Sequence, residues 1–197
     1  MSIAHDLPDT ASLILSLCDV CVATALVGCV LMLLESALVL SFRGTLPPAS
    51  APQPPVTVLK PLHGAEPGLP ARLSAFCHQQ YDGPIQVLCG AQEASSPAVS
   101  AVQALQREFP GAPIELSVDP RRRGSNRKVS NLINTLPRAR YDVLMLSDSD
   151  IVVGSDYLRV IAALLAPPRV GAVTCLYHGI ADDGLWARLS SLAINSH

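Results

Sequence analysis

The chain contains few charged and few aromatic residues for its length. Of its 197 residues, 15% are charged and 4% are aromatic, and the mean hydropathy is +0.35. This composition is too apolar for an ordinary soluble domain and predicts a membrane-spanning segment. The net charge of −2 does not indicate any particular partner, and we expect no nucleic acid to bind.

Cysteines arranged for a metal or a disulfide framework are also missing. Cys18 and Cys21 have the spacing of a metal-binding pair, but no second pair and no nearby histidine accompany them. Cys29 lies in the same apolar run, and the other three cysteines are scattered singly along the chain. We interpret all six as reduced, small apolar side chains, which fits a globular region on the cytoplasmic side of a membrane.

One long apolar run lies near the N-terminus, at residues 11–42. Its uncharged middle, residues 20–34, is shorter than the ~20 residues that a bilayer requires. Extension past Asp19 or Glu35 gives a sufficient length if that acid lies near an interface. We therefore predict a transmembrane helix over residues 11–42, preceded by an N-terminal tail at 1–10. The alternative is a buried helix of a soluble protein.

The first basic residue is Arg43, whereas Asp6 and Asp9 lie near the start of the chain. This pattern does not favour a cleaved signal peptide. The positive-inside tendency places the residues after the span in the cytoplasm. Residues 43–55 are rich in proline and predict a semi-rigid linker. The linker separates a single-pass membrane anchor from a globular domain at residues 56–197.

Strand-like and helical runs alternate after the linker. The predicted strands are residues 56–59, 85–91, 114–118, 143–147 and 170–176. The predicted helices are residues 69–79, 97–109, 128–136 and 155–165, the last with Ser155 as its N-cap. Such alternation predicts an α/β fold with a mainly parallel sheet and helices on both faces.

Two acidic residues, Asp148 and Asp150, directly follow the apolar run Val143–Leu146. In open α/β sheets, ligands bind outside the carboxyl ends of the strands. Two neighbouring carboxylates repel each other unless one keeps a proton or a cation shares the site. Oxygen ligands of this kind suit Mg²⁺ or Mn²⁺, with substrate phosphates completing the coordination shell. We predict a metal site here; a solvated turn or a helix-capping pair is the alternative.

A basic segment, RRRGSNRKVSNL, covers residues 121–132. Arg121–Arg123 can belong to a solvated loop, contact anionic lipid headgroups or bind a ligand diphosphate. Asn126 and Lys128 differ from these arginines because they lie where the loop becomes a predicted helix. Free N–H groups at a helix start, together with a lysine, suit a phosphate group.

A further polar element follows the first predicted strand directly. Lys60 and Pro61 begin the stretch KPLHG, at a place where a phosphate- or base-binding loop would lie in an α/β fold. Residues of this kind are common in loops, so the stretch by itself is a weak indication. We interpret His63 as a surface loop residue rather than as a metal ligand or a base.

Taken together, these elements resemble the ceramide glucosyltransferase-like family, the processive-type GT-A glycosyltransferases of family 21 within the wider family 2 group. The pieces occur in the family's order along most of the chain. They are the apolar span, VLKPLHG, FCHQQYDGPIQVLCGAQEASSPAV, GSNRKVSNL, YDVLMLSDSDIVVGSDYL and LYHGIADDGLWARLSSLAINSH. Among bacterial members, the chain is most similar to hopanoid-biosynthesis glycosyltransferases.

The resemblance implies a GT-A fold, a UDP-sugar donor, a lipid acceptor and transfer with inversion. It assigns Asp148 to the ribose or the metal and Asp150 to the metal between the phosphates. Asn126 and Lys128 match the family's N-x-K near the donor, and Lys60 and Pro61 match its first loop. Glu93 stands where relatives carry an aspartate, and the further acid before the proline is missing. A glutamate can still reach a uracil or ribose.

The resemblance also implies parts that follow His197 in relatives, namely a third acid acting as general base, an R-x-x-R-W motif and further membrane segments. Inversion requires such a base because the acceptor hydroxyl must lose its proton. The expectation is therefore a C-terminally truncated chain. Two alternatives remain open: a nucleotide-sugar-binding membrane protein without activity, and a haloacid dehalogenase-type phosphatase with Asp148 as nucleophile.

Overall fold

The computed structural model describes residues 10–41, 51–181 and 184–195. The chain divides into two compact units, residues 1–46 and 47–197, which are treated separately below. Arg43, most of the predicted tail and most of the predicted linker lie outside the described residues.

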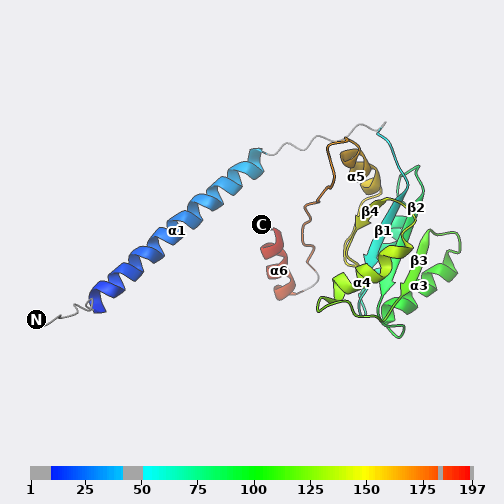
Figure 1. Ribbon diagram of the computed structural model, residues 1–197, viewed down its shortest axis with the longest axis horizontal. Coiled ribbons are helices and arrows are strands. Elements are labelled where there is room, and N and C mark those ends of the chain that lie inside the picture. The colour runs from blue at the N-terminus through cyan, green and yellow to red at the C-terminus, as the bar shows by residue number, and fades with distance from the viewer. Residues whose placement is uncertain (1–9, 42–50, 182–183, 196–197) are drawn as a thin grey trace, which may run out of the picture. The chain divides into compact units, whose positions relative to one another are not determined.

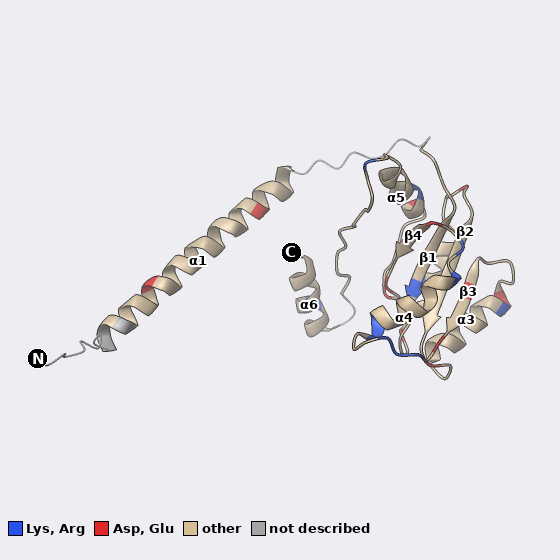
Figure 2. Cartoon of the chain, viewed as in Figure 1, with Lys and Arg blue, Asp and Glu red and all other residues tan. Residues whose placement is uncertain are grey.

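The first unit contains one helix, α1 (Thr10–Ser41), drawn in blue in Figure 1. Its stretch Ile14–Ser41 has a mean hydropathy of 2.5 and is long enough to cross a bilayer. The acidic residues of α1 are Asp19 and Glu35, and acidic positions are drawn in red in Figure 2. None of its most apolar stretch is buried within the structure, unlike a core helix of a soluble protein. α1 is therefore a candidate membrane span.

The second unit is built on a four-stranded parallel sheet with the order β3-β2-β1-β4. The strands are β1 (Val56–Pro61), β2 (Ile85–Ala91), β3 (Ile114–Val118) and β4 (Val143–Leu146). β1 is central, and its Leu59 lies opposite Leu88 of β2 and Leu146 of β4. Because β4 joins on the side of β1 away from β2 and β3, the strand order reverses between β1 and β4. Ligands of open α/β sheets bind at such a reversal.

Helices cover both faces of this sheet, as predicted (Figure 1). α2 (Leu69–Cys77), α3 (Pro97–Glu108) and α5 (Tyr157–Leu165) contribute to one apolar core. α4 (Arg127–Thr135) packs on the opposite face and continues into the 3-10 helix η1 (Leu136–Arg138). The mainly parallel α/β fold expected from the sequence is confirmed.

The alternation of side chains along β1 and β2 separates the two faces. Val56 and Val58 of β1 join Val87 and Cys89 of β2 in the apolar core beneath α2 and α3. Thr57 and Gln86 lie at positions of the opposite parity, and the buried hydroxyl of Thr57 donates a hydrogen bond to Gln86 at 2.8 Å. This alternation follows from the two-residue period of an extended strand.

Two expectations from the sequence differ from the structure. Residues 170–176 form no strand; they run as an extended segment that pairs with no strand in the described part of the chain (Figure 1). An apolar pattern identifies a segment suited to a sheet but does not supply a hydrogen-bonded neighbour. The N-cap of α5 is Asp156 rather than Ser155, and its side chain makes no capping bond. After residues 182–183, which are not described, α6 (Leu185–Asn195) follows.

Candidate donor-binding site

A pocket of about 350 Å³ opens where the carboxyl ends of β1 and β4 meet the start of α4. It lies at the reversal of strand order, the location expected for a ligand. Basic and acidic residues gather at this end of the sheet (Figure 2). The pocket is lined by Pro61, Leu62, His63, Glu66, Gln92, Arg127, Lys128, Asn131, Asp148, Ser149 and Asp150.

Asp148 and Asp150 both line this pocket, at the C-terminal end of β4. The Asp148 side chain is 47% exposed, and its Oδ1 lies 2.5 Å from Nζ of Lys128. The structure therefore brings together an acid pair and a lysine that lie twenty residues apart in the chain. Their roles in donor and metal binding stay predictions.

The start of α4 is fixed by Asn126, whose side chain accepts a hydrogen bond from the Val129 backbone N–H at 3.1 Å. Capping of this kind satisfies one of the N–H groups that a helix start leaves free. The cap places Arg127 and Lys128 in the first turn, and both line the pocket. Arg127 pairs with Glu93 at 2.6 Å across an exposed surface. Glu93 itself is not among the pocket residues.

Lys60 is directed away from the pocket, although Pro61 lines it. The residue is fully buried, and Nζ donates hydrogen bonds to Ser147 Oγ at 3.1 Å and to the Asp148 carbonyl at 2.6 Å. Nζ also lies 4.3 Å from the centre of the Phe76 ring. Burial lowers the pKa of Lys60 to about 8, and nearby acidic groups oppose this shift. The ammonium group of Lys60 thus contacts the backbone of the loop that carries the acid pair, on the side away from the pocket.

Glu66 is a pocket residue that the sequence motifs did not identify. It lies in the loop between β1 and α2, and its Oε1 accepts a hydrogen bond from Ser149 Oγ at 2.6 Å. Its Oε2 is buried and has no hydrogen-bond partner among the described residues. No spacing rule links a glutamate after the first strand to a serine after the fourth.

The chemistry of the donor set fits a hard divalent cation. Asp148 and Asp150 offer carboxylate oxygens, the ligand type that Mg²⁺ and Mn²⁺ prefer. No group of three or more His, Cys, Asp or Glu suited to a metal occurs in the described residues. Two protein carboxylates fit a cation that takes its other ligands from water and substrate phosphates, as Mg²⁺ usually does.

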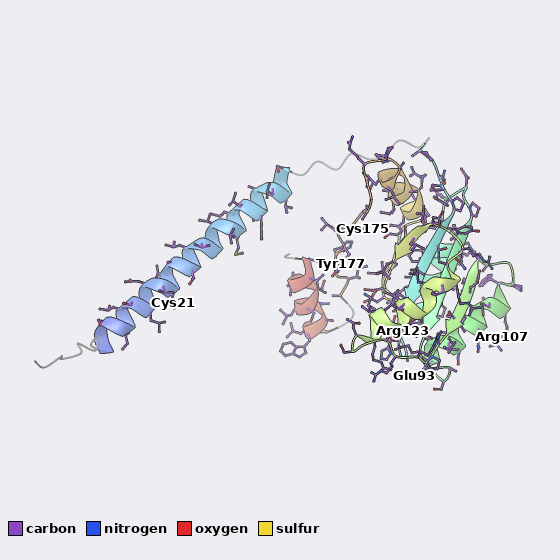
Figure 3. The ribbon with its side chains drawn as sticks, in the orientation of Figure 1. Cys21, Glu93, Arg107, Arg123, Cys175 and Tyr177 are labelled. Atoms are coloured by element: carbon purple, nitrogen blue, oxygen red, sulfur yellow. The ribbon has the colours of Figure 1, made fainter. Side chains whose placement is uncertain are left out.

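The arginines of the basic segment are largely engaged within the loop that precedes α4. Arg121 forms a two-point ion pair with Asp119, which lowers the pKa of that carboxyl to about 2. Arg123 donates from Nε to Asn134 at 2.8 Å. Figure 3 shows Arg123 and Glu93 near the same end of the sheet. Neither Arg121 nor Arg123 lines the pocket.

A second cavity, of about 390 Å³, lies at the opposite end of the sheet. It is bounded by the C-terminal ends of α2 and α3 and by the residues that lead into β3, with Phe109 and Ile114 among them. It contains no acid pair and lies away from the carboxyl ends of the strands, so we do not assign the donor to it.

The fold and the pocket together define a GT-A type of glycosyltransferase domain. A mannosyltransferase from Pyrobaculum calidifontis, solved in complex with GDP-Man and Mn²⁺, superposes with a TM-score of 0.60 at 25% identity. The alignment covers 76% of this chain and 43% of that one. The phosphatase alternative is not supported. The chain belongs to glycosyl transferase family 21, whose model matches residues 20–197.

Curated relatives of this chain are ceramide glucosyltransferases. The Candida albicans protein is 26% identical over 115 residues, and the Komagataella phaffii protein is 30% identical over 115 residues. These alignments cover 53% and 54% of this chain but only 21% and 22% of the relatives. The chain thus spans about a fifth of the length of these proteins. The resemblance to the ceramide glucosyltransferase-like family is confirmed, whereas the likeness to hopanoid enzymes stays a prediction.

Proposed function

We propose that the protein is a membrane-bound glycosyltransferase that moves a sugar from a UDP-sugar to a lipid hydroxyl of ceramide or hopanoid type, with inversion. Asp148, Asp150 and Lys128 carry the proposal because they line one pocket at the reversal of strand order. Two acids and a lysine in one pocket suit a diphosphate held through a cation. Membership of family 21 and the candidate span α1 support a lipid acceptor.

The site residues predicted from the sequence have places in this proposal. Asp150 and Asp148 hold Mg²⁺ or Mn²⁺, which supplies positive charge against the diphosphate when it is bound. Lys128 supplies a second positive charge from the first turn of α4. Asn126 fixes that turn, and Pro61 shapes the wall of the pocket next to β1.

Glu93 receives a revised place within the proposal. Its pairing with Arg127 at 2.6 Å, at the rim of the pocket, makes it a neighbour of the donor rather than a direct ligand. The resemblance to the family implies that Glu93 contacts the uracil or the ribose. Arg127 lines the pocket itself, so Glu93 would act on the donor through Arg127. The general base for the acceptor hydroxyl is not assigned to any residue of this chain.

Nucleotide choice and sugar transfer test the proposal together. We expect the chain, purified in detergent, to bind UDP more tightly with Mn²⁺ than with EDTA, and to prefer UDP over GDP. In mixed micelles containing ceramide, labelled glucose from UDP-glucose should reach the lipid fraction. Metal-independent binding of both nucleotides would overturn the metal assignment, and a preference for GDP would overturn the donor assignment.

An outcome with Mn²⁺-dependent UDP binding but no labelled lipid would leave the chain as a nucleotide-sugar-binding membrane protein. Replacing ceramide by a hopanoid alcohol in the same micelles tests the second acceptor class. A chain that binds UDP and transfers sugar to neither lipid contradicts the transferase proposal for this polypeptide.

A further inference from the structure

The residues of the loop Ser147–Asp150 alternate between buried and accessible positions. Ser147 is 5% exposed and Ser149 is 7% exposed. Asp148 lies between them with its side chain 47% exposed, and Asp150 is exposed as well. Ser147 therefore points into the protein and Ser149 lies largely buried in the pocket wall, while the two acids are accessible from the pocket. Whatever holds the serines also sets the direction of the carboxylates.

Ser149 is held by a charged group from a distant loop. Its hydroxyl donates to Oε1 of Glu66 at 2.6 Å, a short hydrogen bond of the kind that a carboxylate acceptor forms. A serine hydroxyl has one proton, so this bond fixes its orientation. The other oxygen of Glu66 is buried without a partner in the described part of the chain. A buried carboxylate oxygen without a hydrogen-bond partner lowers the stability of the folded state, so this contact does not serve mainly to stabilise the fold.

The preceding serine is held by the opposite charge. Lys60 Nζ donates to Ser147 Oγ at 3.1 Å and to the carbonyl oxygen of Asp148 at 2.6 Å. The second bond fixes the peptide that joins Asp148 to Ser149. The Phe76 ring, 4.3 Å from Nζ, further confines the ammonium group.

Both supports come from the β1 side of the site, and their charges are opposite. Lys60 is the penultimate residue of β1, and Glu66 follows in the loop before α2. Lys60 is buried and Glu66 is partly buried, and buried charges do not generally make a fold more stable than apolar residues of the same size. Their consequence here is geometric, because together they fix three consecutive residues of the loop.

We propose that Lys60 and Glu66 are positioning residues, which act through Ser147, the Asp148 carbonyl and Ser149 to aim the two acids at the donor's cation. Lys60 does not line the pocket, and Glu66, which does line it, is assigned to Ser149 rather than to the donor. The proposal rests on the proposed function, because it concerns the same acid pair. It predicts that loss of either support weakens metal-assisted nucleotide binding and leaves metal-free binding unchanged.

The experiment is a double-mutant cycle on the full chain in detergent, with Mn²⁺ and UDP as the probes. For each variant, the dissociation constant of UDP is measured by titration calorimetry with Mn²⁺ and with EDTA, and the ratio is the readout. We expect Glu66→Ala and Ser149→Ala each to lower the Mn²⁺ enhancement about tenfold, the size of a hydrogen bond to a charged group. The double variant should be no worse than either single variant, because one contact is removed.

Conservative and distant substitutions control for an effect on stability alone. Glu66→Gln keeps an acceptor for Ser149 and should restore most of the enhancement. Glu115, on β3, forms an ion pair with Arg140 far from the pocket. Glu115→Gln removes this pair and should leave the ratio of the two UDP dissociation constants unchanged. Lys60→Met tests the second support; if it does not fold, the Glu66 and Ser149 cycle still decides the proposal.

The outcomes separate the two levels of the argument. If the unmodified chain shows no Mn²⁺ enhancement, the proposed metal site is wrong and this proposal is overturned with it. If the unmodified chain shows the enhancement and the Glu66→Ala and Ser149→Ala variants keep it, the positioning role is wrong and the metal site stands. Additive losses in the double variant would likewise refute a shared contact.

Discussion

At the scale of single residues, two positive groups can pair with the carboxylate of Asp148. Lys128 lies 2.5 Å from its Oδ1, and a divalent cation at the acid pair would use the same carboxylate. Within the described residues, Asp150 forms no ion pair with a basic residue, and it is exposed to the pocket. The two acids therefore differ, and we expect Asp150 to be open to a cation and Asp148 to exchange Lys128 for the cation when it binds.

Replacement of Asp150 by alanine tests the open position. We expect Asp150→Ala to abolish the Mn²⁺- or Mg²⁺-dependent part of UDP binding, because one carboxylate of the predicted metal-binding pair is removed. Calorimetric titration of UDP with and without the metal measures this. Asp142→Ala provides the control, since Asp142 is an exposed acid at the opposite end of β4. Unchanged affinity in Asp150→Ala would count against the site.

Replacement of Lys128 by glutamine should change two affinities in opposite directions. Without nucleotide, Lys128→Gln should bind Mn²⁺ more tightly, because the ammonium no longer neutralises Asp148. With Mn²⁺ present, the same variant should bind UDP several-fold more weakly, because one positive charge near the diphosphate is lost. Electron paramagnetic resonance measures free Mn²⁺ and calorimetry measures UDP. A loss of both affinities would contradict the exchange of partners.

At the scale of secondary-structure elements, α4 sits unusually close to β2. The contact is made at Gly90, where a Cβ atom would lie 2.2 Å from Thr135 Oγ1 and 2.3 Å from Asn131 Oδ1. Asn131 also donates to the Gly90 carbonyl at 2.8 Å and accepts from Thr135 at 3.1 Å. This packing carries the N-terminal turn of α4, with Lys128, to the edge of the pocket.

Gly90→Ala should therefore disturb both the fold and the site. The added methyl group collides with two hydrogen-bonded side chains, and overpacking of this kind costs about 1–3 kcal/mol. We expect a lower free energy of unfolding, measured by denaturant titration, together with weaker UDP binding. Gly111→Ala is the matched control, because nothing lies within 4 Å of the added atom there. Equal stability of the two variants would refute the tight contact.

The sequence was sufficient for the elements of the buried sheet and insufficient for its margins. The strands Ile85–Ala91 and Ile114–Val118 have the predicted bounds, because buried parallel strands are apolar runs with clear ends. The segment 170–176 has a similar composition but lacks a neighbour to pair with in the described structure. A strand depends on a partner that local pattern cannot reveal.

The site was predictable to the same degree. Asp148, Asp150 and Lys128 could be placed together because strand ends and helix starts meet at one edge of a parallel sheet. The direction of Lys60 was not anticipated, although residues of one parity on β1 share a face and Lys60 has the parity of Val56 and Val58. Glu66 could not be found at all, because its link to Ser149 spans 83 residues.

At the scale of the whole molecule, the chain combines an apolar helix with a globular GT-A type domain. Side chains along the described part of α1 are exposed, with Leu33 at 72% and Leu40 at 87%. Exposing a helix that is apolar on all sides to water is unfavourable, so such a helix is expected to lie in a bilayer. The side of that bilayer on which the pocket lies is a prediction from the sequence.

Cys175 offers a way to measure this orientation, because it is an exposed thiol in the globular unit (Figure 3). Burial raises the pKa of Cys77 to about 11 and that of Cys89 to about 12, so these thiols react slowly at neutral pH. A membrane-impermeant maleimide should therefore label Cys175 only after spheroplasts of a bacterial host are permeabilised, if the pocket faces the cytoplasm. Cys175→Ser should remove the label, because the exposed Cys18, Cys21 and Cys29 lie within the candidate span and out of reach of a water-soluble reagent. Labelling of intact spheroplasts would reverse the orientation.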